Sequence, residues 1–501
     1  MAFGILTTNC FKGDYSGLPC TEDVYCGGLM CIDGICGGGA SSPTLTPTAT
    51  GDDPMSESGM PTSESGGEAT GQPSSETGEQ PADTDGVVLV AAGPSQTCAW
   101  MVTNQLRCWG ENGAKGLGTP AAQAPDESCG TNPAYIVDLG EDATDLEIKR
   151  ITVGTQGDED YSCVSFSDGS AKCWGSGMVG EAFDDWLGYG QGDVMSSSGF
   201  IEFANRVIAL EIDAGYLGTC AIVSGEQLTC FGRDDYAPVK SPNSKPNFKA
   251  VAMGREHGCA IDSLDRLVCW GTNTHGQVGV AQGAMSLCGG CSCGFVNLGD
   301  SVDAWQGRKV KHVSGGRYHT CAVMDDEQVW CWGYSGKSQL GTDMVETPCY
   351  NSGDCDPETS LTEKCSYEPL SADLVNQALA ERHVVEIMQL VSGDAHNCVL
   401  VRRDEMYVSP DEESIEVHCW GDGVAGQLGT ANVGNGPSTA PKLVDFDFAV
   451  GEPMRISAHL GNHTCAVFDS GQLWCWGAND SRQVDRCGGD APVEEPRKVF
   501  P

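Results

Sequence analysis

The chain has 501 residues, of which 40% are hydrophobic, and its 70 acidic and 28 basic side chains give a formal net charge of −42. The apolar content is enough for a core, but the charge argues against binding to a nucleic-acid backbone, which requires lysine and arginine. No apolar run reaches the roughly 18 residues of a membrane-spanning helix, so we expect no transmembrane segment.

The cysteine content indicates an oxidising compartment. There are 27 cysteines, whereas cytosolic proteins rarely carry so many because their thiols stay reduced and reactive. We therefore expect an extracellular or cell-envelope protein. The start, MAFGILTTNC, lacks the regions of a signal peptide, so either export uses another route or the true start lies upstream. LTTNC is a poor lipidation signal, and whether Cys10 is free, bridged or lipidated stays open.

Two regions precede the main part of the chain. Residues 1–36 include CTEDVYCGGLMCIDGIC, a stretch too short to bury a core, and we predict a small cysteine-rich module held by disulfides. Residues 37–85 are acidic and rich in Gly, Ser, Thr and Pro, without an aromatic residue. Such a segment cannot bury enough apolar surface to offset the entropy lost on ordering. We therefore predict a disordered linker that tethers the chain at the cell envelope.

One pattern recurs seven times in residues 86–501. CAVFDSGQLWCWG at 465–477 has copies that begin at 98, 163, 220, 259 and 321, and a stretched copy runs from Cys398 to Cys419. A short strand such as VVLVAAG precedes each copy, and a glycine-rich loop such as GTNTHGQVGV follows four of them. These features indicate antiparallel sheets. Seven small sheets can hide their edges by radial arrangement around an axis.

Two further segments carry a structural expectation. Helical periodicity occurs in SADLVNQALAERHVVEIM, which begins at Ser371 inside an insertion. The chain ends in EEPRKVFP, a strand-like piece with no later blade to join. We predict that this piece pairs into the first blade beside residues 87–90 and closes the ring.

The repeats GNHTCAVFDSGQLWCWGAND, GRYHTCAVMDDEQVWCWGYSGKSQLG and GREHGCAIDSLDRLVCWGTNTHGQVG resemble the regulator of chromosome condensation repeat family, in a bacterial-type, cysteine-stapled form. Seven copies in order cover about residues 87–501. The resemblance implies an all-β fold, a seven-bladed β-propeller, here with an N-terminal cysteine-rich module and a disordered linker. The third copy departs from the pattern, because Phe231 replaces tryptophan and no glycine-rich loop follows it.

The spacing of ten between paired cysteines fits a hairpin. If Cys163 faces Cys173, residues 167–169 form a three-residue loop, which a type I turn with glycine in the left-handed position serves. We predict structural disulfides for seven pairs: Cys98 and Cys108, Cys163 and Cys173, Cys220 and Cys230, Cys259 and Cys269, Cys321 and Cys331, Cys398 and Cys419, and Cys465 and Cys475. The alternative is buried free thiols. The spacing does not match zinc ligands.

The residue after each second cysteine is predicted to fill the blade core: Trp109, Trp174, Phe231, Trp270, Trp332, Trp420 and Trp476. Eight cysteines fall in insertions: Cys129, Cys288, Cys291, Cys293, Cys349, Cys355, Cys365 and Cys487. We interpret these as insertion disulfides whose pairing the sequence does not give. CGGCSC, from Cys288, has metal-like thiolate spacings, but no second Cys or His pair stands nearby.

The remaining motifs point to structure rather than chemistry. His257, His319, His396 and His463 all stand two residues before a first cysteine, and we interpret them as hydrogen-bonded structural residues. GYSGKSQLG lacks the spacing of a phosphate-binding loop. GDEDYS and NSGDCDPE leave weak calcium binding open. We predict no catalytic residue, no cofactor and no metal site.

The leading functional hypothesis is a non-catalytic propeller, exported and tethered at the cell envelope, that recognises a protein or surface polymer through its blade loops. We expect a monomer. The first alternative, by family resemblance, is a guanine nucleotide-exchange factor for a small GTPase. The second is an inhibitor of a secreted or periplasmic enzyme.

Overall fold

The computed structural model describes residues 30–32, 35–37, 86–111, 135–143, 145–156, 159–175, 209–216, 218–225, 227–232, 247–280, 288–289, 292–298, 305, 307–345, 347–349, 363–409, 414–430, 436–446, 451–485 and 489–500. The chain divides into two compact units, Met1–Gly78 and Glu79–Pro501. No helix in the described segments combines the length and apolarity needed to cross a bilayer.

In the first unit the structure describes one short hairpin. Strand β1 (Met30–Ile32) pairs antiparallel with β2 (Ile35–Gly37), and Cys31 lies opposite Cys36. The rest of the predicted cysteine-rich module and the predicted linker from residue 38 to 85 lie outside the described residues.

The second unit contains seven antiparallel sheets, each formed by one continuous part of the chain. The first three blades consist of β3 (Val87–Ala92), β4 (Gln96–Met101), β5 (Leu106–Gly110) and β6 (Tyr135–Ile136); β7 (Ile148–Gln156), β8 (Glu159–Phe166) and β9 (Ala171–Gly175); and β10 (Ala209–Ala214), β11 (Gly218–Val223) and β12 (Gln227–Gly232). The fourth consists of β13 (Phe248–Met253), β14 (His257–Asp262), β15 (Leu267–Thr272), β16 (Cys288–Gly289) and β17 (Ser292–Asn297).

The last three blades have four strands each. They are β18 (Val310–Gly315), β19 (His319–Met324), β20 (Val329–Tyr334) and β21 (Cys365–Ser371); β22 (Val384–Ser392), β23 (His396–Arg403), β24 (Ile415–Gly421) and β25 (Ser438–Leu443); and β26 (Pro453–Ser457), β27 (His463–Phe468), β28 (Leu473–Gly477) and β29 (Val493–Lys498). Helix α1 (Asp373–Glu381) and short 3-10 turns at Glu141–Ala143 and Glu405–Tyr407 complete the described elements.

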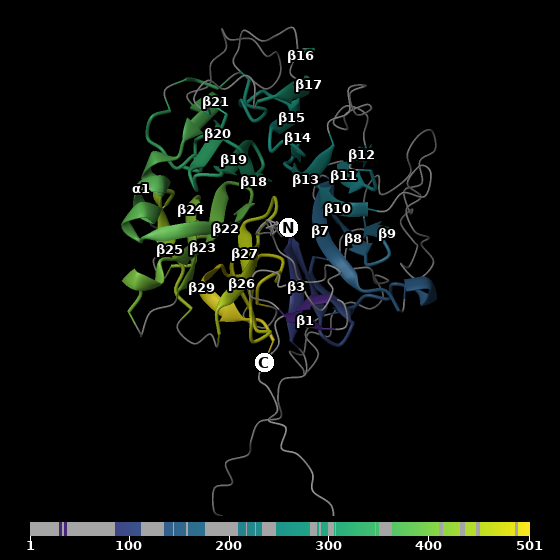
Figure 1. Ribbon diagram of the computed structural model, residues 1–501. Coiled ribbons are helices and arrows are strands. Elements are labelled where there is room, and N and C mark those ends of the chain that lie inside the picture. The colour runs from purple at the N-terminus through teal and green to yellow at the C-terminus, as the bar shows by residue number, and fades with distance from the viewer. Residues whose placement is uncertain are drawn as a thin grey trace, which may run out of the picture. The chain divides into compact units, whose positions relative to one another are not determined.

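The blades form a closed ring. The first strand of every blade contacts the first strands of both neighbouring blades, including β26 of the last blade and β3 of the first. Figure 1 shows the sheets following one another around a common centre. The predicted all-β, seven-bladed propeller is confirmed.

Among the described residues, one apolar core cluster lies between each pair of neighbouring blades, seven in all. The tryptophan that follows a second cysteine packs in the cluster shared with the preceding blade, as Trp332 does with Val278 and Leu298 of the fourth blade. Trp109 packs likewise against Val467 and Leu473 of the seventh blade. Burial of apolar surface between blades is therefore what holds the ring together.

The hairpins have the register expected from the spacing of ten. Cys163 lies opposite Cys173, and Gly169 in the loop between them has φ +81°. Other blades place a non-glycine residue at the same left-handed position, as Asn104 does with φ 57° and Glu327 with φ 62°. The type I turn with a left-handed third residue is therefore used with and without glycine.

The prediction for the end of the chain was wrong. Strand β29 does not pair with the first blade; it is the outer strand of the seventh, where Lys498 lies opposite Trp474. The first blade begins with its own strand, in which Val87 pairs with Met101. The ring closes instead by packing of one complete blade against another.

The stretch from Ser371 also differs from expectation in its second half. Helix α1 ends at Glu381, and His383 has φ 57°, a left-handed conformation that no helix continues. The following VVEIMQLVS forms β22, the first strand of the sixth blade. The β-branched residues Val384, Val385 and Ile387 favour a strand there.

Candidate functional site

The structure places a disulfide across the central hairpin of every blade. The pairs are Cys98–Cys108, Cys163–Cys173, Cys220–Cys230, Cys259–Cys269, Cys321–Cys331, Cys398–Cys419 and Cys465–Cys475, with Cα–Cα distances of 4.0–4.1 Å. Among these cysteines only Cys230 is half-buried; the others are buried. Each bond removes loop freedom from the unfolded chain, a contribution of about 2.5–3 kcal/mol for an 11-residue loop.

The insertion cysteines are described only in part. Cys349 and Cys365 form an eighth disulfide, with a Cα–Cα distance of 5.0 Å. Cys288 lies opposite Cys293 in the pairing of β16 with β17, and their side chains lie outside the described set. The positions of Cys129, Cys291, Cys355 and Cys487 also lie outside it.

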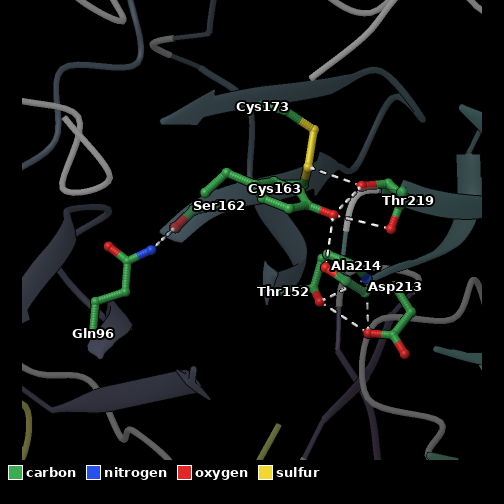
Figure 2. The surroundings of a disulfide bond; sticks show 11 residues. Gln96, Thr152, Ser162, Cys163, Cys173, Asp213, Ala214 and Thr219 are labelled. Atoms are coloured by element: carbon green, nitrogen blue, oxygen red, sulfur yellow. Dashed lines mark hydrogen bonds between the residues drawn. A yellow bond between two sulfur atoms is a disulfide. The ribbon is translucent and has the colours of Figure 1, made fainter. Parts of the chain in front are cut away.

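Side chains beside the disulfides bond from one blade to the next. Figure 2 shows the Cys163–Cys173 bond between Ser162, which accepts a hydrogen bond from Gln96 of the first blade, and Thr219 of the third blade. Tyr161 adds a second link, because its hydroxyl lies 3.0 Å from that of Thr219. The disulfide therefore lies within a polar chain that joins three blades.

The four in-register histidines form the equivalent links in the other half of the ring. Each Nε2 atom lies within hydrogen-bond distance of a side-chain oxygen in the next blade: His257 and Thr320 (2.7 Å), His319 and Asn397 (2.8 Å), His396 and Thr464 (2.8 Å), and His463 and Thr97 (2.7 Å). We call these contacts, together with those of Gln96 and Tyr161, the blade latches. The prediction of structural histidines agrees with this geometry.

Tryptophan side chains reinforce the latches. The indole Nε1 of a blade donates to the carbonyl of a glutamine in the glycine-rich loop of the preceding blade: Trp109 to Gln483 (2.8 Å), Trp332 to Gln277 (3.0 Å), Trp420 to Gln339 (3.1 Å) and Trp476 to Gln427 (2.9 Å). Thr97 and Thr320 donate to the same carbonyls as Trp109 and Trp332. One backbone oxygen thus anchors two side chains of the next blade.

The interface between the third and fourth blades lacks this latch. Gly218 occupies the histidine position and Gly258 the threonine position, so neither can supply a side-chain bond. The Nε1 atom of Trp270 is buried and has no acceptor among the described residues, and the third repeat has no glycine-rich loop to offer one. Apolar packing of Trp270 with Ile222 and Leu228 remains.

Burial keeps the latch histidines neutral. Desolvation lowers the pKa of His257, His396 and His463 to about 3 and that of His319 to about 4. Burial acts in the opposite direction on Asp160, whose pKa rises to about 7. The described residues include no group of three or more side chains suited to hold a metal ion.

The repeats and the fold are similar to those of known proteins. The pattern of the Regulator of chromosome condensation (RCC1) repeat matches residues 248–277, 310–339 and 461–483, which are the fourth, fifth and seventh blades. The solved structure of human WBSCR16 superimposes with a TM-score of 0.56 at 16% identity over 79% of this chain and 93% of that one. Prp20p from Saccharomyces cerevisiae gives 0.55 at 16% over 83% and 87%.

The chain carries RCC1 repeats folded as a seven-bladed propeller. Protein pim1 of Schizosaccharomyces pombe is 28% identical over 35% of this chain, and the match covers 29% of pim1. The Ultraviolet-B receptor UVR8 of Arabidopsis thaliana is 22% identical over 64% of this chain and 76% of the receptor. The chain therefore spans less than a third of pim1 and about three quarters of the receptor.

The turns between the first and second strands of the RCC1 repeats define one face of the propeller, the turn face. There the guanidinium of Arg255 lies 4.5 Å from the ring centre of Tyr216 and 6.0 Å from that of Tyr318. Arg317 also stacks on Tyr318, at 5.2 Å, and pairs with Asp394 at 3.3 Å. Arginine held between aromatic rings keeps its donors available at the edge.

Several of these residues escaped the sequence analysis. Alignment of the position two residues before each first cysteine adds Gln96, Tyr161 and Gly218 to the four histidines. The residues at the start of each latch could therefore have been predicted from the sequence. The glutamine carbonyls could not have been predicted, because any residue type supplies a backbone acceptor. The Arg255 stack also depends on neighbours in two other blades, and spacing alone does not reveal it.

Proposed function

We propose that this RCC1-type propeller is a non-catalytic binding module of an oxidising compartment, extracellular or at the cell envelope. The observation that supports this most is the disulfide in every blade hairpin. Proteins whose thiols stay reduced rarely hold such bonds, and a ring fixed by latches and disulfides presents its loops on a rigid scaffold. Recognition sites commonly lie on such loops. The turn face, with its stacked Arg255, offers one surface for a protein or surface polymer.

The competing candidate is nucleotide exchange on a small GTPase. Its support is the family itself: the structural study of Prp20p concerns binding to Gsp1p and histones, and another structure of Prp20 contains bound Kap60. An exchange factor would need an intracellular, reducing setting, which eight disulfides disfavour. Inhibition of a secreted enzyme would be one form of the proposed binding function.

The test is the intact mass of natively purified protein after alkylation without reduction. The proposal expects one or no modified thiol, because nearly every cysteine is bridged. If fourteen or more of the 27 cysteines react, the hairpins are reduced in the native protein and the proposal fails. In that case nucleotide-exchange assays with small GTPases become the relevant measurement.

A further inference from the structure

A recurring irregularity marks the start of every blade. In all seven sheets the pairing of the first strand with the second shifts after one residue, which leaves the second residue of the first strand unpaired: Val88, Lys149, Leu210, Lys249, Lys311, Val385 and Met454. A β-bulge re-aims the side chain of its extra residue, and bulges are frequent at barrel rims and functional sites. We call these seven residues the rim.

The rim lies around the axis on the face opposite the turn face. The first strands form the inner ring, and in six blades the residue before the first strand accepts a backbone bond from the hairpin loop of the same blade, as Gly86 does from Val102 and Lys309 from Asp325. The hairpin loops and the rim therefore share one face, the hairpin face. The seven bulges bring residues that are 39 to 74 positions apart in sequence to equivalent places on this face.

Four of the seven rim residues are large, apolar and exposed. Their exposed fractions are 39% for Val88, 51% for Leu210, 52% for Val385 and 55% for Met454. Blades six, seven and one are neighbours, so Val385, Met454 and Val88 hold three successive rim positions, which we call the apolar arc. Single exposed apolar residues are ordinary, but a grouped set at equivalent positions indicates an interaction surface.

The three lysines do not make this face positive. Lys149 pairs with Glu147 at 2.9 Å, Lys311 with Glu327 at 2.9 Å, and Lys249 with Asp265. Their ammonium groups are thus held by carboxylates of the same chain.

The hairpin loops add negative charge around the apolar arc. Asp168, Asp325 and Asp469 are exposed, and Asp325 lies near Lys309, which itself pairs with Asp265. These loops belong to the second, fifth and seventh blades, so the acidic groups are spread around the face. The net charge of the whole chain, −42, adds a long-range negative field. This field attracts cations and repels a second copy of the chain.

We propose that the hairpin face binds a cationic amphipathic protein segment, which inserts apolar side chains at the rim and places lysine or arginine beside the acidic loops. This inference rests on the proposed binding function and names the partner's chemistry. The apolar rim supplies the anchor site that dominates such interfaces. The acidic loops supply steering and orientation.

The probe is a fluorescent helical peptide of leucine and lysine, about 18 residues long, titrated with the full chain at about 0.15 M salt, where the Debye length is about 8 Å. A peptide with serine in place of leucine has the same charge without the anchor. The proposal expects the leucine peptide to bind about tenfold more tightly than the serine peptide. Equal binding of the two peptides would mean attraction by charge alone and would overturn the proposal.

Substitution of rim residues tests whether the peptide binds at the rim. The rim variant L210S/V385S/M454S removes three of the four apolar rim residues, and M344S/V424S/L443S removes three exposed apolar residues at other positions, with exposed fractions of 71%, 55% and 44%. The rim variant is expected to lose the tenfold preference, whereas the control keeps it. Retention by the rim variant, or equal loss in both, would refute the site. Near-ultraviolet circular dichroism shows that each variant is folded, and the thiol count tests the proposed function independently.

Discussion

The Nε2 atom of His463 in the seventh blade lies 2.7 Å from the hydroxyl oxygen of Thr97 in the first blade. Thr97 in turn donates to the backbone carbonyl of Gln483 at 2.8 Å. All three groups are buried, so water cannot replace a missing partner. This latch joins the two ends of the propeller, which share no sheet.

Replacing Thr97 by valine should therefore destabilise the ring. The isosteric T97V variant keeps the volume but leaves Nε2 of His463 without its partner, which costs about 1–3 kcal/mol. Guanidinium unfolding measures the loss. T103V, in the exposed loop of the same hairpin, is the control and should change stability by less than about 0.5 kcal/mol. Equal effects of the two variants would contradict a role for the latch.

Two buried tryptophans offer a matched test of the missing latch. Trp332 donates to Gln277, whereas the Nε1 atom of Trp270 has no acceptor among the described residues. W332F and W270F lose similar volume, but W332F also loses a hydrogen bond while W270F removes an unsatisfied donor. We expect W332F to cost about 1–2 kcal/mol more in unfolding free energy. If W270F is as costly, the third and fourth blades are linked in a way that this geometry does not provide.

Acid should weaken the folded state through the latch histidines. The pKa of His257, His396 and His463 is about 3 in the folded chain, against 6.5 for an unperturbed histidine. Their contribution is fully present above pH 6.5. As the pH falls toward 3, these histidines become protonated in the unfolded chain but stay neutral in the folded chain. The free energy of unfolding therefore drops by about 1.4 kcal/mol per pH unit for each histidine.

Glutamine substitution tests this dependence, because Gln96 makes the same link in the first blade. H257Q/H396Q/H463Q should flatten the fall of the unfolding midpoint between pH 6.5 and 4, and H383Q, at an exposed position, should not. Asp160 has the opposite sign: its pKa is raised to about 7, so its destabilising effect grows as pH rises from 3.8 to 7. An unchanged slope in the triple variant would show that the histidines do not govern acid stability.

The eight described disulfides should differ in their rate of reduction. Thiol–disulfide exchange needs access to a sulfur atom, and Cys230 is the half-buried cysteine among those bridged in the described chain. Mild reduction of the native protein, followed by alkylation and peptide mapping, is expected to label Cys220 and Cys230 first. Labelling of Cys465 and Cys475 at the same rate would mean that global unfolding limits reduction.

Local patterns in the sequence were sufficient for the blades. The ten-residue spacing of Cys163 and Cys173 and the loop between them specify the hairpin without any distant contact. The seven copies, with the family resemblance, then lead to the propeller. Each of these inferences uses residues within one repeat, where spacing and geometry are directly coupled.

Contacts between repeats were harder to predict. The position of β29 was wrong because a strand-like sequence does not specify which edge it joins, and the edge of β28 in its own blade was free. The second half of the Ser371 segment was missed because VVEIM fits both helical and strand patterns. The rim depends on a one-residue bulge, which sequence periodicity does not show.

The closure of the ring has a consequence for how the chain can be cut. Every described sheet comes from one uninterrupted segment, and Phe500 after β29 packs edge-to-face on Trp109 of the first blade at 5.5 Å. Joining residue 500 to residue 86 and opening the chain between residues 232 and 247 would divide none of the described sheets and sever none of the described latches. The propeller is thus suited to circular permutation, because a new pair of chain ends there leaves every blade intact.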